Sequence, residues 1–320
     1  MPSRRTRYSQ IMKQLSTRVV ESLRCPVCGA CVRLGQQDCV CTEGHAYLLA
    51  RGVPILIAAD KSIFDPEDIA RASGTPTRGT RLGRLLPSLS KNLAAAHNYK
   101  LFKNELLLLC SNPLVLDIGG GEGGVGEREL DDPRVELVIT DVAIGEQTQV
   151  AADAHQLPFA DGTFDGVVAQ AVLEHVVDPW LCVEEMHRVL KPSGIVYAET
   201  PFMQQVHMGR YDFTRFTALG HRRLFRRFEQ ISVGTAIGPG SALGWSLAYF
   251  VCSFAPNKQS RRLLSALGRV LFFWLRSFDA VLTTDSASDA AGGFFFFGRR
   301  SEITMSDRDL IKQYRGGMSL

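Results

Sequence analysis

A run of glycines after a short apolar segment constrains the fold of this chain more than any other feature. Residues 114–117 read Leu-Val-Leu-Asp, and five glycines fall within the six positions 119–124. A short apolar run without alternation is typical of a parallel strand buried on both faces. Glycine lets the backbone turn sharply and approach a ligand closely. We therefore predict a buried strand, a tight ligand-binding loop and then a helix.

The rest of the chain repeats this alternation of strands and helices. Apolar runs at 135–139, 166–169 and 195–198 alternate with helical patterns, of which 181–190 is the clearest, and 191–194 reads as a turn. Further candidate strands lie at 231–233 and 293–297, with helices between them at 241–281. Alternation of this kind predicts an α/β fold, with helices on both faces of a mostly parallel sheet.

Composition excludes several classes of protein. The chain has 320 residues, 45% hydrophobic and 22% charged, which is globular and long enough for roughly two domains. A net charge of +3 gives little support for a dedicated nucleic-acid-binding protein. The apolar stretches 242–255 and 270–275 are shorter than the ~20 residues of a membrane span. No signal-peptide pattern follows the basic N-terminus, so we expect a cytoplasmic location.

The cysteines are unevenly distributed, since five of the eight lie between positions 25 and 41. The pattern Cys25-x2-Cys28-x12-Cys41-x3-His45 supplies three thiolates and one imidazole, a donor set for tetrahedral Zn²⁺. Cys39 is an alternative to Cys41 as the third thiolate. A module of this size has little core of its own, so the metal would supply folding free energy. We predict a zinc site with Cys25, Cys28, Cys41 and His45 as ligands.

Residues 23–57 resemble a zinc ribbon that precedes many methyltransferase domains. They are similar to the small zinc-binding activator subunits of tRNA and protein methyltransferases. The Cys-x3-His half is closer to the ribbon of the ribosomal RNA guanine-N1 methyltransferases. The resemblance implies a structural or substrate-positioning zinc ion, because four protein ligands leave no open position for chemistry.

Charge around the glycine loop indicates its ligand. Three glycines have the dinucleotide-binding spacing G-x-G-x-x-G, namely Gly119, Gly121 and Gly124. Asp141 follows at the distance expected for a ribose contact, and this pattern alone fits both NAD and S-adenosylmethionine. Asp117 and Glu122 would repel a pyrophosphate but attract the ammonium and sulfonium of S-adenosylmethionine. The charges favour S-adenosylmethionine over an NAD-dependent oxidoreductase.

Residues 150–175 and 184–194, within a region of roughly 113–203, resemble class I S-adenosylmethionine-dependent methyltransferases of the ubiquinone/menaquinone group. The resemblance implies a Rossmann-like, seven-stranded core. It places Asp117 near the methionine ammonium and Asp141 on the ribose hydroxyls. It also implies the other cofactor contacts: close approach at Gly119 and Gly121, the adenine at Asp153 and Ala154, and the methionine side at Gln170.

The acceptor is expected where the chain leaves the strand ending near residue 200, because open α/β sheets bind ligands beyond the carboxyl ends of their strands. Residues 201–216 resemble a loop in a bacterial subgroup of these enzymes, often linked to polysaccharide or secondary metabolism. His207 is a candidate general base, and Tyr211 and Asp212, with Arg215, are candidates for orienting a substrate. His175 is expected to cap or pack a helix. Alignment supplies most of the help that methyl transfer needs, so a base is optional.

These observations predict five segments: a lead-in (1–22), the zinc ribbon (23–57), a helical connector (58–112) with a linker at 73–84, the methyltransferase domain (113–300) with a helical insertion at about 239–290, and a tail (301–320). The predicted reaction moves a methyl group from S-adenosylmethionine to oxygen, nitrogen or carbon of a small or lipid-linked metabolite. An rRNA or tRNA methyltransferase and a non-catalytic cofactor-binding regulator are the alternatives.

The aromatic stretches 241–256 and 263–281 are expected to pack on the sheet as a helical subdomain. A lid over an apolar acceptor, or a peripheral membrane contact, is the second interpretation. The sequence makes no prediction of the oligomeric state.

Overall fold

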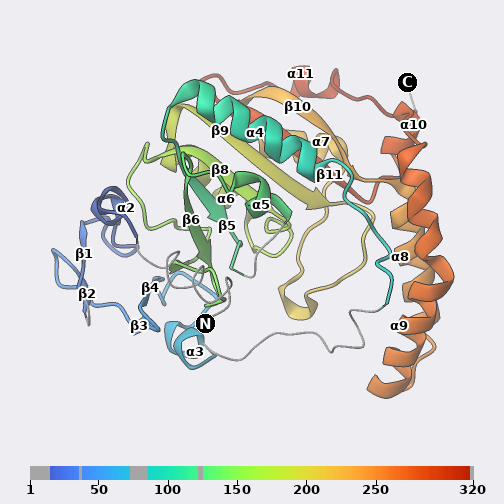
Figure 1. Ribbon diagram of the computed structural model, residues 1–320, viewed down its shortest axis with the longest axis horizontal. Helices are drawn as coiled ribbons and strands as arrows, with labels where there is room; N and C mark the ends of the chain where they lie inside the picture. Colours follow the sequence, from blue (N-terminus) through green and yellow to red (C-terminus); the bar gives the residue numbers. More distant parts are fainter. Residues whose placement is uncertain (1–14, 36–37, 73–85, 122–124, 318–320) are drawn as a thin grey trace.

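The computed structural model describes residues 15–35, 38–72, 86–121 and 125–317 (Figure 1). At its centre lies a nine-stranded sheet in the order β10-β11-β9-β8-β5-β6-β7-β4-β3. Its strands are β3 (Leu49–Ala50), β4 (Val53–Leu56), β5 (Leu114–Ile118), β6 (Glu136–Asp141), β7 (Val150–Ala152), β8 (Phe164–Gln170), β9 (Leu190–Pro201), β10 (Phe228–Ile237) and β11 (Gly293–Arg300). A separate pair joins β1 (Val32–Leu34) to β2 (Cys39–Cys41). The predicted α/β fold class is confirmed.

Seven strands, β5 to β11, form the expected Rossmann-like core. Strands β5 to β9 run parallel, and β11 is antiparallel to both of its neighbours, β9 and β10. Every residue of β5 is buried, as expected for a central parallel strand. The turn predicted at 191–194 is wrong, because these residues lie within β9. The register between β8 and β9 shifts between Phe164 and Gly166, which accommodates the extra residues at the start of β9.

The N-terminal segment extends this sheet. Strand β4 pairs in parallel with β7 through Ile55 and Leu56, and β3 folds back on β4. Val19, in α2 (Thr17–Ser22), and Leu23 are completely buried in the same apolar core as the central strands. The sheet therefore has nine strands, seven from the predicted core and two from the segment that resembles a zinc ribbon. The proposed division of the chain into domains remains a prediction.

Helices cover both faces of the sheet. On one face, α4 (Ala95–Leu109) packs Tyr99 and Phe102 in one cluster with alternate residues of the central strands. On the other, α6 (Pro179–Val189) packs Val183 and Met186 among the residues that point the opposite way. Asp178 caps α6 by accepting a hydrogen bond from the Leu181 backbone N–H. The smaller helices are α3 (Pro66–Ala72), α5 (Val125–Leu130), η2 (Gly209–Tyr211), α7 (Ala218–Leu224) and α11 (Asp307–Ile311).

A helical hairpin between β10 and β11 projects at one end of the molecule (Figure 1). It consists of α8 (Pro239–Cys252) and α9 (Lys258–Phe272), followed by η3 (Phe273–Ala280) and α10 (Asp285–Ser288). The helices approach closely at Gly268, where an added Cβ would lie 3.0 Å from Ala248. Asp279 accepts hydrogen bonds from the Gly240 N–H at 2.7 Å and the Ser241 hydroxyl at 2.5 Å, which caps α8. Among the described helices, none combines the length and apolar character that crossing a bilayer requires.

Candidate functional site

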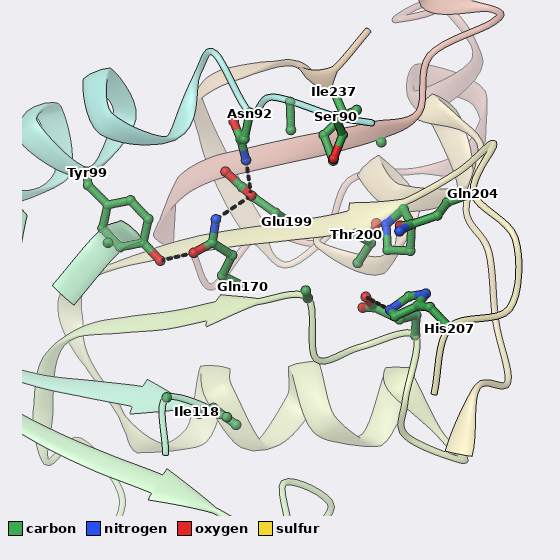
Figure 2. A pocket seen from close by; sticks show the side chains of 18 of the residues that line it. Ser90, Asn92, Tyr99, Ile118, Gln170, Glu199, Thr200, Gln204, His207 and Ile237 are labelled. Atoms are coloured by element: carbon green, nitrogen blue, oxygen red, sulfur yellow. Dashed lines mark hydrogen bonds and ion pairs between the residues drawn. The ribbon is translucent and has the colours of Figure 1, made fainter. Parts of the chain in front are cut away.

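A cavity of about 410 Å³ opens at the carboxyl ends of the central strands (Figure 2). The strand order reverses between β5 and β8, and open α/β sheets bind their ligands at such a reversal. Asp117 and Gly119 contribute to the wall from the β5 side, and Gln170 lines it from the end of β8. Glu174 and His207 form another part of the wall. One cavity thus joins the predicted cofactor loop to residues 201–216, which we call the acceptor segment.

The described part of the glycine loop requires glycine. Gly119 has φ +79°, and an added Cβ would lie 2.5 Å from Val172 Cγ2. At Gly120 an added Cβ would lie 2.7 Å from Asp117 Oδ2. The backbone therefore passes directly over the buried Asp117 carboxylate. Glu122 and Gly124, which also belong to the predicted loop, lie outside the described residues.

Asp141 meets the glycine loop at the end of β6. Its Oδ2 accepts a hydrogen bond from the Gly121 N–H at 3.2 Å, and its Oδ1 accepts one from the Ala143 N–H at 2.9 Å. The chain then returns to the loop, because the Gln147 N–H donates to the Gly121 carbonyl at 3.2 Å. Gly121 and Asp141 are thus in contact, although neither belongs to the cavity wall.

Asp153, the predicted adenine contact, is buried among donors from the protein itself. The Ser62 hydroxyl donates to Oδ2 at 2.5 Å, and His155 Nδ1 lies 2.5 Å from Oδ1. Burial raises the pKa of Asp153, but the hydrogen bonds with His155 and Ser62 outweigh burial and lower it. The neighbouring Ala154 is also buried. An adenine amino group at Asp153 would have to share or displace one of these partners.

Gln170 belongs to a chain of side-chain hydrogen bonds along the cavity (Figure 2). Tyr99 donates to Gln170 Oε1 at 3.3 Å, and Gln170 Nε2 donates to Glu199 Oε2 at 2.8 Å. Asn92 Nδ2 donates to the same Glu199 oxygen at 2.6 Å. Burial raises the pKa of Glu199. Glu199 was not predicted as a site residue, although it lies near the carboxyl end of β9 and pairs with Gln170 of β8.

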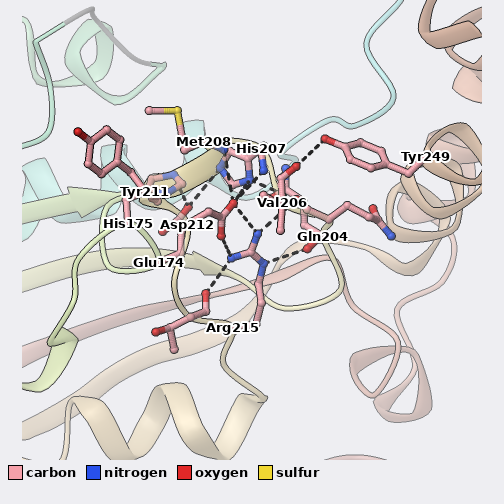
Figure 3. A network of polar contacts seen from close by, with 12 residues as sticks. Glu174, His175, Gln204, Val206, His207, Met208, Tyr211, Asp212, Arg215 and Tyr249 are labelled. Atoms are coloured by element: carbon pink, nitrogen blue, oxygen red, sulfur yellow. Dashed lines mark hydrogen bonds and ion pairs between the residues drawn. The ribbon is translucent and has the colours of Figure 1, made fainter. Parts of the chain in front are cut away.

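His207 lines the cavity, whereas Tyr211 and Asp212 do not. Figure 3 shows these three residues with Arg215 in a network of polar contacts. The His207 backbone N–H donates to Asp212 Oδ2 at 2.8 Å, and the ring Nδ1 lies 3.4 Å from that oxygen. Asp212 pairs with Arg215 through both carboxylate oxygens. Burial opposes ionisation of Asp212, but Arg215 holds its pKa well below the usual range. The Tyr211 ring packs 5.6 Å from the Phe64 ring.

Glu174 was overlooked in the sequence, although it directly precedes His175. The side chain is buried, and neither carboxylate oxygen has a hydrogen-bond partner among the described residues. Its Oε1 lies 3.6 Å from His175 Nε2 and 3.8 Å from His207 Nε2. Burial raises the pKa of Glu174 to about 8. The prediction that His175 caps a helix is wrong, because α6 begins only at Pro179 and is capped by Asp178.

The predicted zinc ligands lie close together. Cys28 Sγ and Cys41 Sγ are 3.8 Å apart, and His45 Nδ1 lies 3.7 Å from Cys25 Sγ and 3.3 Å from Cys41 Sγ. All four ligand atoms lie within 4.8 Å of one another. A tetrahedron with Zn–S bonds of about 2.3 Å has edges of about 3.8 Å. The donors therefore fit a zinc ion, and we call these four residues the Cys3His group.

The remaining cysteines of the N-terminal segment lie outside this group. Cys39 is buried in the apolar core, and burial, with Asp38 nearby, raises its pKa to about 11. Cys31 is exposed. Of the two alternatives left open by the sequence, the structure places Cys41 rather than Cys39 beside the other donors.

Residues 116–198 match the family model described as a methyltransferase domain. These residues run from β5 into β9 and include the described part of the glycine loop, the switch between β5 and β8, and Glu174. The prediction of a class I methyltransferase domain is thereby confirmed for this part of the chain.

Curated relatives agree with this assignment. An uncharacterized methyltransferase of Mycobacterium sp. (strain JLS) is 38% identical over 90 residues, which cover 25% of this chain and 36% of the relative. The ubiquinone/menaquinone biosynthesis C-methyltransferase UbiE of Saccharophagus degradans is 30% identical over 141 residues, which cover 38% of this chain and 57% of the relative. The demethylmenaquinone methyltransferase of Mycolicibacterium vanbaalenii is 31% identical over 138 residues, covering 41% and 58%. The chain thus spans 36% to 58% of the length of these relatives.

The comparison with solved structures finds partial similarity, with TM-scores below 0.5. Geranyl diphosphate C-methyltransferase from Streptomyces coelicolor A3(2) has a TM-score of 0.44 at 14% identity, covering 73% of this chain and 97% of that one. Phosphoethanolamine N-methyltransferase 2 of Haemonchus contortus has a TM-score of 0.39 at 14% identity, covering 65% and 57%.

Proposed function

We propose that this chain transfers the methyl group of S-adenosylmethionine to an oxygen, nitrogen or carbon atom of a small acceptor molecule. The observation that carries the proposal is the methyltransferase domain at 116–198, whose glycine loop opens into the same cavity as His207. In the reaction the methyl carbon–sulfur bond breaks as the bond to the acceptor forms. The acceptor loses one proton, and S-adenosylhomocysteine leaves.

The cofactor would bind along the β5 side of the cavity. When bound, S-adenosylmethionine supplies an electrophilic methyl group on a positively charged sulfur atom. The buried Asp117 carboxylate under the glycine loop suits its ammonium group, and Gln170 would line the methionine side. Asp141 would hold the ribose. Asp153 and the Ala154 N–H would hold the adenine, at the cost of rearranging the contact from Ser62.

The acceptor would bind on the His207 side. Well-oriented reactants gain up to roughly 7–11 kcal/mol from alignment alone, so positioning is the main task of these residues. His207 would take the acceptor proton, a contribution of ~10²–10⁴-fold where the nucleophile must be deprotonated. Asp212 positions His207 through the backbone N–H, and Arg215 in turn fixes Asp212. Tyr211 supports the site through its carbonyl oxygen, which lies 2.8 Å from His175 Nδ1.

The helical hairpin favours an apolar or lipid-linked acceptor. Trp245 of α8 lines the cavity, and Tyr249 of α8 donates a hydrogen bond to the Val206 carbonyl in the acceptor segment. The hairpin exposes large apolar side chains, and the first turns of α9 carry the exposed basic residues Lys258, Arg261 and Arg262. These apolar residues are Phe250, Phe254, Leu263, Leu267, Val270, Leu271 and Trp274. A helix with large apolar side chains on one face and basic residues on the other is typical of contact with an anionic membrane surface.

Flotation with vesicles tests this assignment of the hairpin. The chain should associate with vesicles that contain anionic lipid, and the double substitution Leu263→Glu and Leu267→Glu should abolish association. Leu108→Glu is the matched control, because Leu108 is 80% exposed on α4 rather than on the hairpin. Equal association of the double variant and the control would exclude the hairpin as the contact.

The Cys3His group is assigned a structural zinc ion. Around a zinc ion, its four donors would complete a tetrahedron and leave no position for a substrate. The cysteines and β4 lie within the N-terminal segment whose core is continuous with the main sheet, so the metal would stabilise the edge of the sheet at β4. A reducing, cytoplasmic location would keep the thiols available as ligands.

Radiolabel transfer tests the proposed reaction. The full chain is incubated with methyl-labelled S-adenosylmethionine and a cell extract, which is then separated into small-molecule, lipid and RNA fractions. We expect label in the lipid or small-molecule fraction. Label confined to RNA would replace the proposed acceptor with the rRNA or tRNA alternative, and no transfer to any fraction would favour the non-catalytic regulator.

A further inference from the structure

Three side chains of types that can ligate a metal lie close together, namely Glu174, His175 and His207 (Figure 3). Glu174 and His207 also line the cavity. Glu174 Oε1 lies 3.6 Å from His175 Nε2 and 3.8 Å from His207 Nε2. The three ligand atoms all lie within 4.8 Å of one another. Metal bonds of about 2.0–2.2 Å to nitrogen and oxygen separate neighbouring ligand atoms by about 3.0–3.5 Å. Small side-chain movements would therefore close these atoms around one ion, and we call the three residues the Glu-His-His group.

Both imidazole rings are oriented for metal binding. His175 Nδ1 lies 2.8 Å from the Tyr211 carbonyl oxygen, which can only accept, so Nδ1 carries the hydrogen and Nε2 presents its lone pair to Glu174. His207 Nδ1 likewise faces two acceptors, the Asp212 carboxylate and the Gln205 carbonyl, each at 3.4 Å. In metal sites the second ring nitrogen of a ligating histidine almost always donates to such an acceptor.

The carboxylate of Glu174 provides the second, independent observation. It is 1% exposed, lies in the cavity wall, and has no hydrogen-bond partner for either oxygen among the described residues. A buried carboxylate without partners is costly, because burial removes its hydration and nothing replaces it. A bound cation between Glu174 and the two imidazoles would satisfy it.

We propose that Glu174, His175 and His207 bind a divalent transition-metal cation in the cavity wall. Two imidazoles and one carboxylate suit zinc, iron or cobalt better than magnesium or calcium, which prefer oxygen ligands alone. Three protein ligands leave a position open, as in catalytic rather than structural metal sites. That position would take an oxygen of the acceptor, which defines the substrate class as molecules with a metal-binding hydroxyl or carbonyl group.

The use of the metal rests on the proposed methyl transfer. A metal-bound hydroxyl loses its proton more readily, so the acceptor could lose its proton to solvent before attack on the methyl carbon. The metal would then occupy His207 Nε2, and His207 would act as a ligand instead of a general base. Metal binding at the site does not depend on the methyl transfer and can be measured without it.

Cobalt titration of the full chain tests the site. The protein is prepared with zinc in the Cys3His group, and Co²⁺ binding is followed by calorimetry, visible absorption and metal analysis. We expect one Co²⁺ per chain beyond the retained zinc, without the thiolate charge-transfer absorption that binding to cysteine would produce. Wild-type protein that binds no stoichiometric Co²⁺, or binds it only with the thiolate signature, would overturn the proposal.

Two variants and a control assign the ligands. Glu174→Gln keeps the shape of a buried side chain, and His207→Ala alters a side chain that is 29% exposed, so at least one should fold. Each should weaken Co²⁺ binding by at least about tenfold. Glu184→Gln, which removes only a surface ion pair with Arg227, should leave binding unchanged. Unchanged Co²⁺ affinity in a folded Glu174 or His207 variant would refute the assignment.

Calorimetry with S-adenosylmethionine on the same samples separates the two proposals. Cofactor binding without Co²⁺ binding would remove the metal site and leave the proposed function standing. Co²⁺ binding without cofactor binding would leave the metal site standing and remove the proposed function.

Discussion

The two clusters of metal-ligating residues differ in their donors and surroundings. The Cys3His group offers three sulfur atoms and one nitrogen, and its four donor atoms lie within 4.8 Å of one another. The Glu-His-His group offers two nitrogens and one carboxylate, and Glu174 and His207 border the cavity. Four protein ligands suit a structural metal ion that stabilises the fold, whereas three protein ligands leave a coordination position for a substrate. We therefore expect changes in the first group to affect stability and changes in the second to affect activity.

The largest effect is expected on removal of zinc from the Cys3His group. Isolated zinc modules owe about 10–16 kcal/mol to the metal, but this segment also packs on the main core, so we expect a loss of at least about 3 kcal/mol. With about 2.1 cal/mol/K of unfolding entropy per residue, that loss corresponds to roughly 4–5 °C in Tm for 320 residues. Calorimetry with and without a zinc chelator measures it.

Cys28→Ser should reproduce the effect of the chelator. Cys31→Ser is the matched control, because Cys31 is exposed and lies outside the group. A chelator that removes the zinc without lowering Tm would show that the closed group does not stabilise the fold.

Gly119→Ala probes a position where stability and activity should fall together. The left-handed φ of +79° and the 2.5 Å approach to Val172 should together cost about 2–5 kcal/mol and also weaken cofactor binding. Gly162→Ala separates the two causes, because Gly162 has φ +62° with nothing within 4 Å. Its cost should be about 1 kcal/mol, with cofactor binding unchanged. Denaturant unfolding and calorimetry provide the two measurements, and equal losses in both variants would exclude the contact with Val172 as the cause.

Glu174→Gln should separate activity from stability. A neutral amide of the same shape fits a site where burial already disfavours the charged carboxylate, so the free energy of unfolding should change by less than about 1 kcal/mol. Methyl transfer should nevertheless fall by about 10–100-fold with the loss of a ligand. Unfolding and initial-rate measurements on one preparation test this. A variant that is strongly destabilised but fully active would show that Glu174 contributes to stability rather than to activity.

The smallest effect is expected at Tyr249, which connects the hairpin to the acceptor segment. Tyr249→Phe removes the 2.8 Å hydrogen bond to the Val206 carbonyl, worth about 1 kcal/mol or less at this exposed position. We expect a few-fold increase in the KM for the acceptor with little change in kcat. Tyr314→Phe, the control, removes another exposed tyrosine hydrogen bond, to the Asp289 carboxylate, and should leave both constants unchanged. A lower kcat at constant KM in the Tyr249 variant would contradict a role in acceptor binding alone.

Local patterns were sufficient to predict much of the fold. The apolar run at 114–117 and the following glycines define a buried strand and its loop because both depend on neighbouring residues. The spacing of Cys25, Cys28, Cys41 and His45 indicated a group that the structure brings together for the same reason. The pairing of β4 with β7 was not predicted, although all four residues of β4 are buried, because sheet order depends on contacts between distant segments.

The acceptor side was harder to predict because distant parts of the chain build it. Glu174 follows β8 and His207 follows β9, and the pair of Asp212 with Arg215 fixes the segment that carries His207. Ala171 has φ +55°, a strained conformation at the edge of the cavity that no local pattern indicates for alanine. The position of His207 in the chain predicts a role at the site, but no local pattern indicates that Glu174 lies 3.8 Å from its ring.

Calorimetric titration with S-adenosylmethionine tests the central claim most directly. Wild-type protein should bind one cofactor per chain, and Asp141→Ala should weaken binding by about 10–100-fold, since a charged hydrogen bond contributes about 1.5–3 kcal/mol. Asp132→Ala, which alters only a surface pair with Arg134, should bind as the wild type does. Absence of binding by the folded wild-type chain would contradict the assignment of this protein as an S-adenosylmethionine-dependent methyltransferase.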